Sequence, residues 1–366
     1  MIDVFWDERV LAHDTGAGLF EAGPSPLLDI PELHPENAER VRNMRSLLER
    51  GPIAPHLRWR SGRLAEISEL ETVHDPAYVR SIREACEAGG GTLTGTTVLG
   101  PASWEPVLAA AGTCLAAADA VLDRETSVAY ALVRPPGHHA QPAQADGYCF
   151  FSHAALVAER ARGRRIQRVA VVDWDVHHGN GTQECFYDRA DVLTVSLHMR
   201  HGSWGPSHPQ TGSAAELGLG AGAGYNVNLE LGLGAGDGVY ATALEEVVVP
   251  ILRQFRPGLI VGACGQDAST FDPNGRQNVS MAGFRRIGTI LAAAAAELTG
   301  GRLVLVQEGG YARTYAALCL HATLEGVAAL AEPLLADPLA YLPDDPSRGR
   351  EGIEAAKSSL SRCWGL

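Results

Sequence analysis

The sequence predicts a single α/β domain, in which a central, mostly parallel sheet is flanked by helices and carries a functional site at the carboxyl ends of its strands. Three observations predict this fold. Short apolar runs recur along the chain in the manner of strands buried on both faces. Ala-rich segments of helical character lie between many of them. No change in composition marks a second domain, so we expect one unit over residues 1–366, with a C-terminal extension from about 332 to 366 packed on it.

Each expected strand is short, almost continuously apolar and rich in residues that favour strands. In chain order the strand segments are SVAYALV (127–133), RVAVVDW (168–174), VLTVSLH (192–198), YNVNLEL (225–231), GLIVGAC (258–264) and RLVLVQE (302–308). The expected helices are the Ala-rich segments 104–123, 152–162, 237–255 and 280–299. Because helices separate many of the strands, we expect parallel strands with helices covering both faces of the sheet.

Composition and charge exclude several classes of protein. Hydrophobic residues make up 46% of the chain and charged residues 20%, which allows a sizeable core. The net charge of −13 argues against nucleic acid or an anionic membrane as the main partner. The seven cysteines form no C-x-x-C pair, so a reducing compartment fits best. The N-terminal residues do not resemble a signal peptide, and the apolar run at 290–298 is too short to span a bilayer, so we expect a cytoplasmic protein.

Polar residues follow four of the expected strands, at the points where ligands bind in open α/β sheets. The side chains concerned are His138 and His139, then Asp173, Asp175, His177 and Asn180, then Asp267, and finally Tyr311. Solvation alone does not explain why four separate strand ends deliver His, Asp and Tyr to one edge of the sheet. The pattern therefore predicts a catalytic or metal-binding site at that edge.

Asp175, His177 and Asp267 are the candidate metal ligands. Asp175 and His177 are two residues apart just past a strand end, so their side chains can converge if the backbone stays extended. Asp267 can add a third ligand from another strand. One nitrogen and two carboxylates with an open position are typical of a catalytic zinc site. The alternative is a capped loop in which Asp175 accepts backbone N–H groups.

The tandem His138 and His139 and the single Tyr311 are candidates for proton transfer. A neutral imidazole is a suitable general base near pH 7, and a partner on its other nitrogen sets its tautomer. Asp173 and Asn180 remain free for that supporting role. Tyr311 follows two glycines and can donate to an oxyanion. Each of these side chains, taken alone, is also compatible with an ordinary buried His or Tyr.

The motifs as a set resemble the histone deacetylase superfamily. In chain order they are HPENAERV (34–41), RPPGHHA, DWDVHHGNGTQ, SLH, GQDAS followed by DP, and EGGY. The superfamily includes bacterial histone deacetylase-like amidohydrolases and acetylpolyamine amidohydrolases, on the arginase–deacetylase fold. The resemblance covers roughly residues 1 to 325, and the Asn in HHGNGTQ is similar to the class II branch.

This resemblance implies a zinc-dependent hydrolysis of an amide. Asp175, His177 and Asp267 would bind one catalytic Zn²⁺, and the metal and Tyr311 would polarise the scissile carbonyl for attack by metal-activated water. By the same resemblance His139 would be general base and then general acid.

The resemblance also implies supporting residues and structural K⁺ ions. His138 would be the electrostatic partner of His139 and would bond to Asp173, while Asn180 would hold His139. The inner K⁺ site would map to Asp173, Asp175, His177, Ser196 and Leu197. The outer K⁺ site would map to Phe186, Arg189, Val192 and Tyr225.

The substrate tunnel is expected at five positions, and two departures from the family pattern leave the substrate open. The positions are Gly147, Tyr148, Trp204, Asn274 and Gly309. The family usually has Phe where this chain has Gln266. It has Leu in many lysine deacetylases, or Glu in some polyamine deacetylases, where this chain has Asn274. Residues 13–34 resemble a long first loop of the kind that builds subunit contacts, so we expect a homo-oligomer, a dimer or tetramer.

The sequence therefore favours an enzyme that removes acetyl or other acyl groups from acyl-lysine or from a small acylated amine such as an acetylpolyamine. One alternative is a catalytically weak acyl-lysine or acylamine binding protein on the same fold. A second is a binuclear manganese ureohydrolase, which would need more carboxylates than the strand ends offer.

Overall fold

The computed structural model describes residues 1–18, 23–200, 211–339 and 342–366. Within these residues, eight parallel strands form one sheet in the order β2-β1-β5-β10-β9-β6-β7-β8, which confirms the expected fold class. The strands, in that order, are Leu57–Ser61, Ile2–Trp6, Val128–Ala131, Leu303–Gln307, Leu259–Cys264, Val169–Asp173, Val192–Met199 and Asn226–Leu231. The six expected strand segments all form strands at these positions.

The strands β1 and β2 were not expected from the sequence. The strand β2 lies at the edge of the sheet and reads LRWRS, so its pattern lacks the apolar run of a buried strand. Its two arginines, Arg58 and Arg60, bind the buried carboxylate of Asp3 on β1, with N–O distances of 2.7 to 3.1 Å. The pairing of β1 with β2 therefore depends on contacts between segments more than fifty residues apart.

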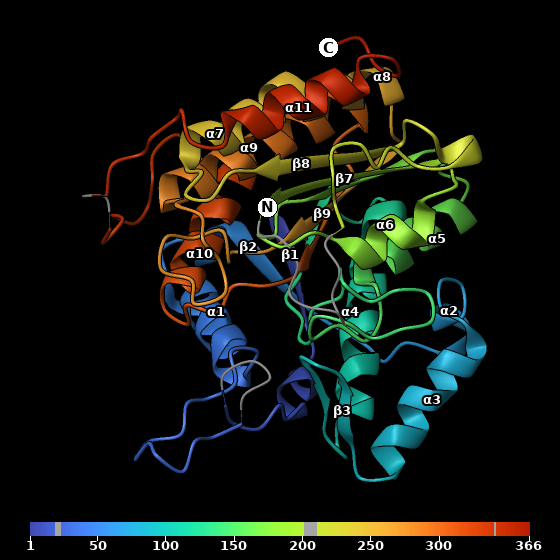
Figure 1. The fold of residues 1–366 in the computed structure, drawn as a ribbon, viewed down its shortest axis with the longest axis vertical. Coiled ribbons are helices and arrows are strands. Elements are labelled where there is room, and N and C mark those ends of the chain that lie inside the picture. The colour runs from blue at the N-terminus through green and yellow to red at the C-terminus, as the bar shows by residue number, and fades with distance from the viewer. Residues whose placement is uncertain (19–22, 201–210, 340–341) are drawn as a thin grey trace.

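Helices cover both faces of the sheet (Figure 1). The helices α4 (Trp104–Leu122) and α5 (His153–Gly163) pack together on one side. The helices α1 (Ala38–Arg50), α9 (Met281–Leu298) and α10 (Tyr315–Val327) pack on the other. Further elements are α2 (Ile67–Leu70), α3 (Pro76–Glu87), α6 (Asn180–Phe186), α11 (Arg350–Leu360) and an antiparallel hairpin of β3 (Gly91–Thr94) and β4 (Thr97–Leu99).

The expected helix 237–255 is interrupted in its middle. It consists of α7 (Asp237–Ala243), one π-helical turn (Leu244–Val248) and α8 (Val249–Phe255). Pro250 lies in the first turn of α8. A proline has no N–H to donate and its ring crowds the preceding turn, so the backbone widens there instead of continuing as an α-helix.

The helix α4 is long and apolar enough to cross a membrane by length and composition, and it is the one such helix among the described residues. It is also 78% buried inside the protein over its most apolar window. Its Ala-rich faces contact β1, β5, β10 and α5. That placement is the one expected for the central helix of a folded core, which passes the same test of length and hydropathy.

The C-terminal segment packs against the edge strand β8. The helix α11 runs so close to β8 that a side chain at Gly352 would lie 2.0 Å from the Glu230 carbonyl oxygen. The indole Nε1 of Trp364 donates to the carbonyl of Gly224 at 2.7 Å. This segment therefore covers an edge that would otherwise be open to pairing with another strand.

Candidate active site

Two adjacent strand ends bring Asp175, His177 and Asp267 together. The strands β6 and β9 are neighbours in the sheet, so the residues that follow Asp173 and Cys264 meet at one edge. The Nδ1 atom of His177 lies 3.1 Å from an oxygen of Asp175 and 3.1 Å from an oxygen of Asp267. Both carboxylates are fully buried. The sequence expectation that these three side chains converge is therefore met by the geometry.

The arrangement of these groups fits a metal ion. One oxygen of Asp175 accepts the N–H of Gly309 at 2.8 Å, and one oxygen of Asp267 accepts the N–H of Val176 at 2.8 Å. The second oxygen of each carboxylate faces the centre of the cluster, where each of the three residues offers one ligand atom within 4.8 Å of the others. A nitrogen and two carboxylate oxygens are a donor set that zinc accepts, with room for a further ligand.

Electrostatics also favours a cation at this centre. Burial, together with the charge of Asp175, raises the pKa of Asp267 to about 7. Burial lowers the pKa of His177, but hydrogen bonds to Asp175 and Asp267 outweigh burial and raise that pKa to about 10. The paired carboxylates therefore require a positive charge between them, which either a protonated imidazole or a metal ion can supply.

The backbone at Gly309 is part of this centre. A side chain there would lie 2.2 Å from the Oδ2 atom of Asp267 and 2.6 Å from the Oδ2 atom of Asp175. Glycine is thus required at this position because the backbone approaches two carboxylates directly. The space at Gly309, expected from the sequence to face substrate, is occupied by the candidate metal ligands.

The two histidines of the tandem pair have different partners. The Nδ1 atom of His138 lies 2.8 Å from Asp173, and its Nε2 atom lies 3.6 Å from Asp175. The Nδ1 atom of His139 lies 2.6 Å from the side-chain oxygen of Asn180. That amide oxygen can only accept, so Nδ1 of His139 carries the proton and Nε2 keeps a free lone pair.

A second hydrogen bond supports this orientation of the amide. The amide nitrogen of Asn180 donates to a carboxylate oxygen of Asp146 at 3.1 Å. The oxygen of the same amide must then face His139. The ring of His139 packs on Gly147, where a side chain would come within 2.2 Å of the imidazole.

The surroundings shift the pKa values of the two histidines in opposite directions. Burial lowers the pKa of His138, but the charges of Asp175 and Asp173 outweigh it and raise that pKa well above its ordinary value. Burial lowers the pKa of His139 well below its ordinary value, and the charges of His138 and His177 lower it further. One ring is therefore cationic and the other neutral, although the two lie only 4.0 Å apart between centroids.

Tyr311 completes the group of side chains at this edge. Its ring lies edge-on to that of Tyr148, with 5.7 Å between centroids, and the Arg40 guanidinium lies 5.0 Å from the ring centre. Burial raises the pKa of Tyr311 well above its ordinary value, although the charge of Arg40 opposes the shift. The phenol is therefore a neutral hydrogen-bond donor at physiological pH.

Comparison with known proteins identifies the family. The histone deacetylase domain model matches residues 34–327. The chain belongs to the histone deacetylase family. It is 53% identical to histone deacetylase 8 of Arabidopsis thaliana, over 98% of this chain and 96% of that protein. It is 39% identical to the histone deacetylase-like amidohydrolase of Pseudomonas aeruginosa, over 92% of this chain and 88% of that protein.

A solved structure of the same family has the same fold. The HDA15 HD domain superposes with a TM-score of 0.85 and 30% sequence identity, covering 99% of this chain and 95% of that one. The resemblance inferred from the motifs is thus confirmed, and the chain is an amide hydrolase of the histone deacetylase family. Members of this family are typically metal-dependent, and the buried triad is the candidate metal site.

The expected tunnel residues of this histone deacetylase family member lie around Tyr311 where the structure describes them. The phenol of Tyr148 accepts a hydrogen bond at 3.3 Å from the amide nitrogen of Asn274, and the ring of His34 lies edge-on to it. The side-chain oxygen of Asn274 is buried and has no hydrogen-bond partner among the described atoms. Trp204 lies outside the described residues.

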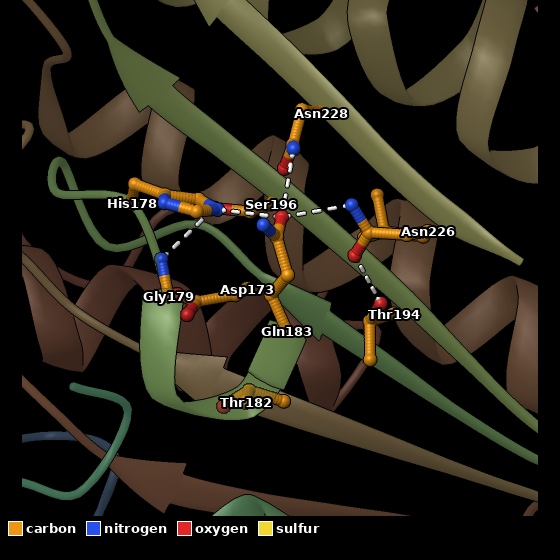
Figure 2. Close-up of a pocket in the computed structure, with 10 residues that line it drawn as sticks. Asp173, His178, Gly179, Thr182, Gln183, Thr194, Ser196, Asn226 and Asn228 are labelled. Atoms are coloured by element: carbon orange, nitrogen blue, oxygen red, sulfur yellow. Dashed lines mark hydrogen bonds between the residues drawn. The ribbon is translucent and has the colours of Figure 1, made fainter. Parts of the chain in front are cut away.

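The residues expected to bind K⁺ fall into two groups. Asp173 and Ser196 face each other across β6 and β7, and Leu197 follows on β7. Asp173 and Ser196 also line a small cavity of about 10 Å³, and its other walls include Thr182 on α6 and Asn228 on β8 (Figure 2). The outer group lies at the opposite end of the same strands. It consists of Phe186 at the end of α6, Arg189, Val192 at the start of β7, and Tyr225 just before β8.

The fourth residue of DVHH, His178, is not part of the triad. Its Nδ1 atom lies 2.9 Å from the Thr211 hydroxyl. Its Nε2 atom lies 3.0 Å from the side-chain oxygen of Gln183 (Figure 2).

A cluster of buried charges beneath Tyr311 was not identified from the sequence. Glu36 accepts from Arg40 at 3.1 Å and from Arg134 at 2.9 Å, and all three side chains are buried. Arg40 also donates to the backbone carbonyls of Gly310 and Glu308. The motif HPENAERV contains Glu36 and Arg40, but charged residues at helical spacing ordinarily indicate an exposed face, so nothing local reveals their burial.

Proposed function

We propose that this histone deacetylase family member is a zinc-dependent amidohydrolase that removes acetyl or other acyl groups from an amine. The observation that carries the proposal is the meeting of Asp175, His177 and Asp267 with a neutral His139 and a neutral Tyr311 at one edge of the sheet. These groups combine a metal-ligand set, a proton acceptor and an oxyanion donor, which are the components of metal-assisted amide hydrolysis.

Asp175, His177 and Asp267 would hold the zinc ion. When bound, zinc supplies a Lewis acid for the amide carbonyl and lowers the pKa of water to near neutrality. The N–H groups of Gly309 and Val176 keep the two carboxylates oriented toward the centre. This backbone support fixes the ligands before any metal arrives, which reduces the cost of ordering them on binding.

His139 is proposed to take a proton from water and then to deliver it to the leaving amine. Its Nε2 lone pair is free, because Asn180 fixes the proton on Nδ1. His138 would stay protonated against Asp173, and its charge would keep His139 from holding a proton at rest. General acid–base catalysis of this kind contributes roughly 10²- to 10⁴-fold to a rate.

Tyr311 is proposed to donate a hydrogen bond from its phenolic hydroxyl to the oxygen of the scissile carbonyl as negative charge develops there. Its neutral state at physiological pH makes it a donor throughout the working range. Removal of one such donor typically costs about 10²- to 10³-fold in kcat.

Structural K⁺ and a homo-oligomeric state also belong to the proposal. K⁺ is proposed at the inner and outer groups of residues described above. The oligomer, a dimer or tetramer, is supported by the first loop, where Leu27, Leu28 and Ile30 are 91%, 69% and 81% exposed. Three large apolar side chains exposed in one short segment are typical of a surface that meets another protein.

The proposed substrates are acyl-lysine peptides and small acylated amines such as acetylpolyamines. Tyr148, Asn274 and Gly147 lie beside Tyr311 and His139, where a substrate side chain would pass. Asn274 is uncharged, so it neither attracts a second amine cation nor presents an apolar wall. Both substrate classes therefore enter the test below.

The test is a comparison of kcat/KM on acetyl-lysine peptides, longer acyl-lysines, acetylputrescine and acetylspermidine, using the wild type and Tyr311→Phe. We expect turnover that depends on zinc, and a loss of roughly 10²- to 10³-fold in kcat for Tyr311→Phe with zinc content unchanged. A preference of two orders of magnitude for one class would identify the substrate class.

Three results would contradict the proposal. Full activity of Tyr311→Phe would exclude the proposed role of the phenol. Binding of acylated amines without turnover would instead favour a binding protein. Two metal ions per chain by elemental analysis, with turnover of a guanidino substrate, would favour a binuclear ureohydrolase.

A further inference from the structure

A chain of three buried polar side chains lies beneath the loop that carries Tyr311. Tyr130 on β5, Gln307 at the end of β10 and Gln266 just past β9 are all fully buried. These strands are neighbours in the sheet, so the three side chains form one continuous row across it. The Tyr130 hydroxyl donates to Oε1 of Gln307 at 2.5 Å, and Nε2 of Gln307 donates to Oε1 of Gln266 at 2.8 Å.

The order of donors and acceptors in this row fixes the orientation of both amides. The carbonyl oxygens of Glu308 and Gly309 can only accept, so the amide nitrogen of Gln307 faces them and its Oε1 accepts from the Tyr130 hydroxyl. The same amide nitrogen donates to Gln266, whose own amide nitrogen turns back to the carbonyl of Cys264 at 3.0 Å. Reversing either amide would set two donors or two acceptors against each other in a buried place, which is costly.

The oriented amides hold the backbone that leads to Tyr311. The Nε2 atom of Gln307 lies 3.0 Å from the Glu308 carbonyl oxygen and 2.9 Å from the Gly309 carbonyl oxygen. The backbone N–H of Gln266 also donates to the carbonyl of Gly309 at 3.1 Å. The carbonyl of Gly309 is thus held from two sides.

The position of this backbone affects both a proposed zinc ligand and Tyr311. The N–H of Gly309 donates to Asp175, one of the proposed zinc ligands. The next residue, Gly310, has a φ of +120° and packs on the side chain of Gln266, 3.0 Å from where its own Cβ would lie. Tyr311 follows directly. A shift in the amides of Gln307 or Gln266 would therefore move a ligand-binding N–H and the phenol together.

A purely stabilising role does not explain this row. Replacing a buried hydrogen-bonded pair by apolar side chains of similar volume is often nearly neutral for stability. The hydrogen-bonded pair of Gln307 and Gln266 differs from an apolar pair because its directional bonds allow the loop before Tyr311 only one orientation. The family usually has Phe at the position of Gln266. A Phe side chain cannot accept the hydrogen bond from Gln307 that helps to turn its amide toward the Gly309 carbonyl.

We propose that Gln307 and Gln266, supported by the hydroxyl of Tyr130, are positioning residues that set the Gly309–Tyr311 loop and so align the phenol and the Asp175 carboxylate. This inference rests on the proposed function for its kinetic readout. Its second readout is the affinity for zinc measured with the metal alone, which does not depend on the substrate.

The decisive variants are Gln307→Leu and Tyr130→Phe, with Gln277→Leu as the matched control. Gln277 is a buried glutamine in the same loop as Gln266, but its side chain bonds elsewhere: it accepts from Ala235 N–H at 2.8 Å and donates to the Leu231 carbonyl at 3.4 Å. We expect Gln307→Leu to lose roughly 10- to 100-fold in kcat and in zinc affinity, with KM little changed. Tyr130→Phe removes one hydroxyl and should lose roughly 2- to 10-fold in kcat. Gln277→Leu should keep both values near wild type.

A double variant tests whether the two glutamines act as one unit. Because Gln266 and Gln307 bond directly, Gln266→Leu combined with Gln307→Leu should lose little more than the worse single variant. If Gln307→Leu does not fold, Tyr130→Phe decides the question, since its change is confined to one hydroxyl.

The results separate this inference from the proposed function. Wild-type protein that binds zinc but turns over no acylated amine would overturn the proposed function, and the zinc affinities of the variants would then decide the positioning role alone. Unchanged kcat and zinc affinity in both Gln307→Leu and Tyr130→Phe would overturn the positioning role. An equal loss in Gln277→Leu would overturn it as well, because the effect would then be general destabilisation.

Discussion

The adjacent histidines His138 and His139 have different charge states because their hydrogen-bond partners differ. His138 bonds to the carboxylate of Asp173 and His139 bonds to the neutral amide of Asn180. A carboxylate stabilises an imidazolium, whereas an amide oxygen accepts the Nδ1 proton without adding a charge. The residue type at position 180 therefore sets whether His139 is free to accept a proton.

Asn180→Asp should move the pH dependence of the reaction. A carboxylate beside Nδ1 raises the pKa of His139, which burial now holds well below its ordinary value. Catalysis by the neutral ring is lost as the pH falls through that pKa, so raising it should shift the acid limb of the kcat/KM profile to higher pH. The measurement is kcat/KM from pH 5 to 9.

A paired substitution controls for repulsion in that experiment. Asp146 accepts from the amide of Asn180 in the wild type, so Asn180→Asp brings two carboxylates together. Asn180→Asp combined with Asp146→Asn relieves that repulsion and should keep the shift. An acid limb at the same pH in the wild type and in the double variant would show that His139 is not the base.

The end of strand β10 acts as a unit that supports several parts of the site. The side chain of Gln307 holds the loop before Tyr311, and the side chain of Glu308 accepts from the N–H groups of Gly137 and His138 at 2.6 and 3.1 Å. Successive side chains of a strand point to opposite sides. One strand end can therefore support the tyrosine loop on one side and the histidine turn on the other.

Glu308→Gln should change how stability varies with pH. Burial raises the pKa of Glu308 to about 8, against 4.5 for an ordinary Glu, although the charge of His138 opposes the shift. The protonated carboxyl stabilises the fold fully below pH 4.5, and that contribution is lost as the pH rises through about 8. Wild type should therefore lose stability relative to Glu308→Gln between pH 5 and 9 in urea unfolding.

Glu308→Leu is the matching variant without an acceptor. It leaves the N–H groups of Gly137 and His138 unpaired, at a cost of about 1–3 kcal/mol each at any pH. A difference between wild type and Glu308→Gln that stays constant from pH 5 to 9 would show that Glu308 is ionised in the same way in the folded and unfolded chain.

The fold of the whole molecule places two buried carboxylates, which follow two different strands, at one point. Asp175 and Asp267 come from β6 and β9, ninety-two positions apart in the sequence, and their ion pairs in the described structure are with His177 and His138. The fold thus holds a cation site that an unfolded chain does not possess. Metal binding is therefore expected to stabilise the native state.

Chelation should lower both activity and stability. With dipicolinate in excess, we expect turnover to disappear and the Tm to fall, and added Zn²⁺ should restore both. Free zinc at 100 times Kd stabilises the folded state by about 2.7 kcal/mol. Asp267→Asn, which removes one ligand charge, should show little response of its Tm to chelator or zinc. Turnover that survives complete removal of metal would contradict the proposed reaction.

The sequence by itself determined the elements that form the centre of the fold. The six neighbouring strands from β5 to β8 and the helices α4, α5 and α9 each carry a continuous local pattern, and the polar residues after the strands mark the functional edge. The motifs were specific enough to indicate the family. Local patterns suffice here because apolar periodicity and strand-end residues are properties of short segments.

Only the tertiary structure decided which side chains meet. The order β10-β9-β6 placed Asp175 beside Asp267, and the pairing of β1 with β2 depended on Asp3 and two distant arginines. The buried charges of Glu36 and Arg40, and the row from Tyr130 to Gln266, join residues tens to more than a hundred positions from their partners in the sequence. No short segment encodes these contacts, because a buried polar group is satisfied by whatever the packing of the sheet brings next to it.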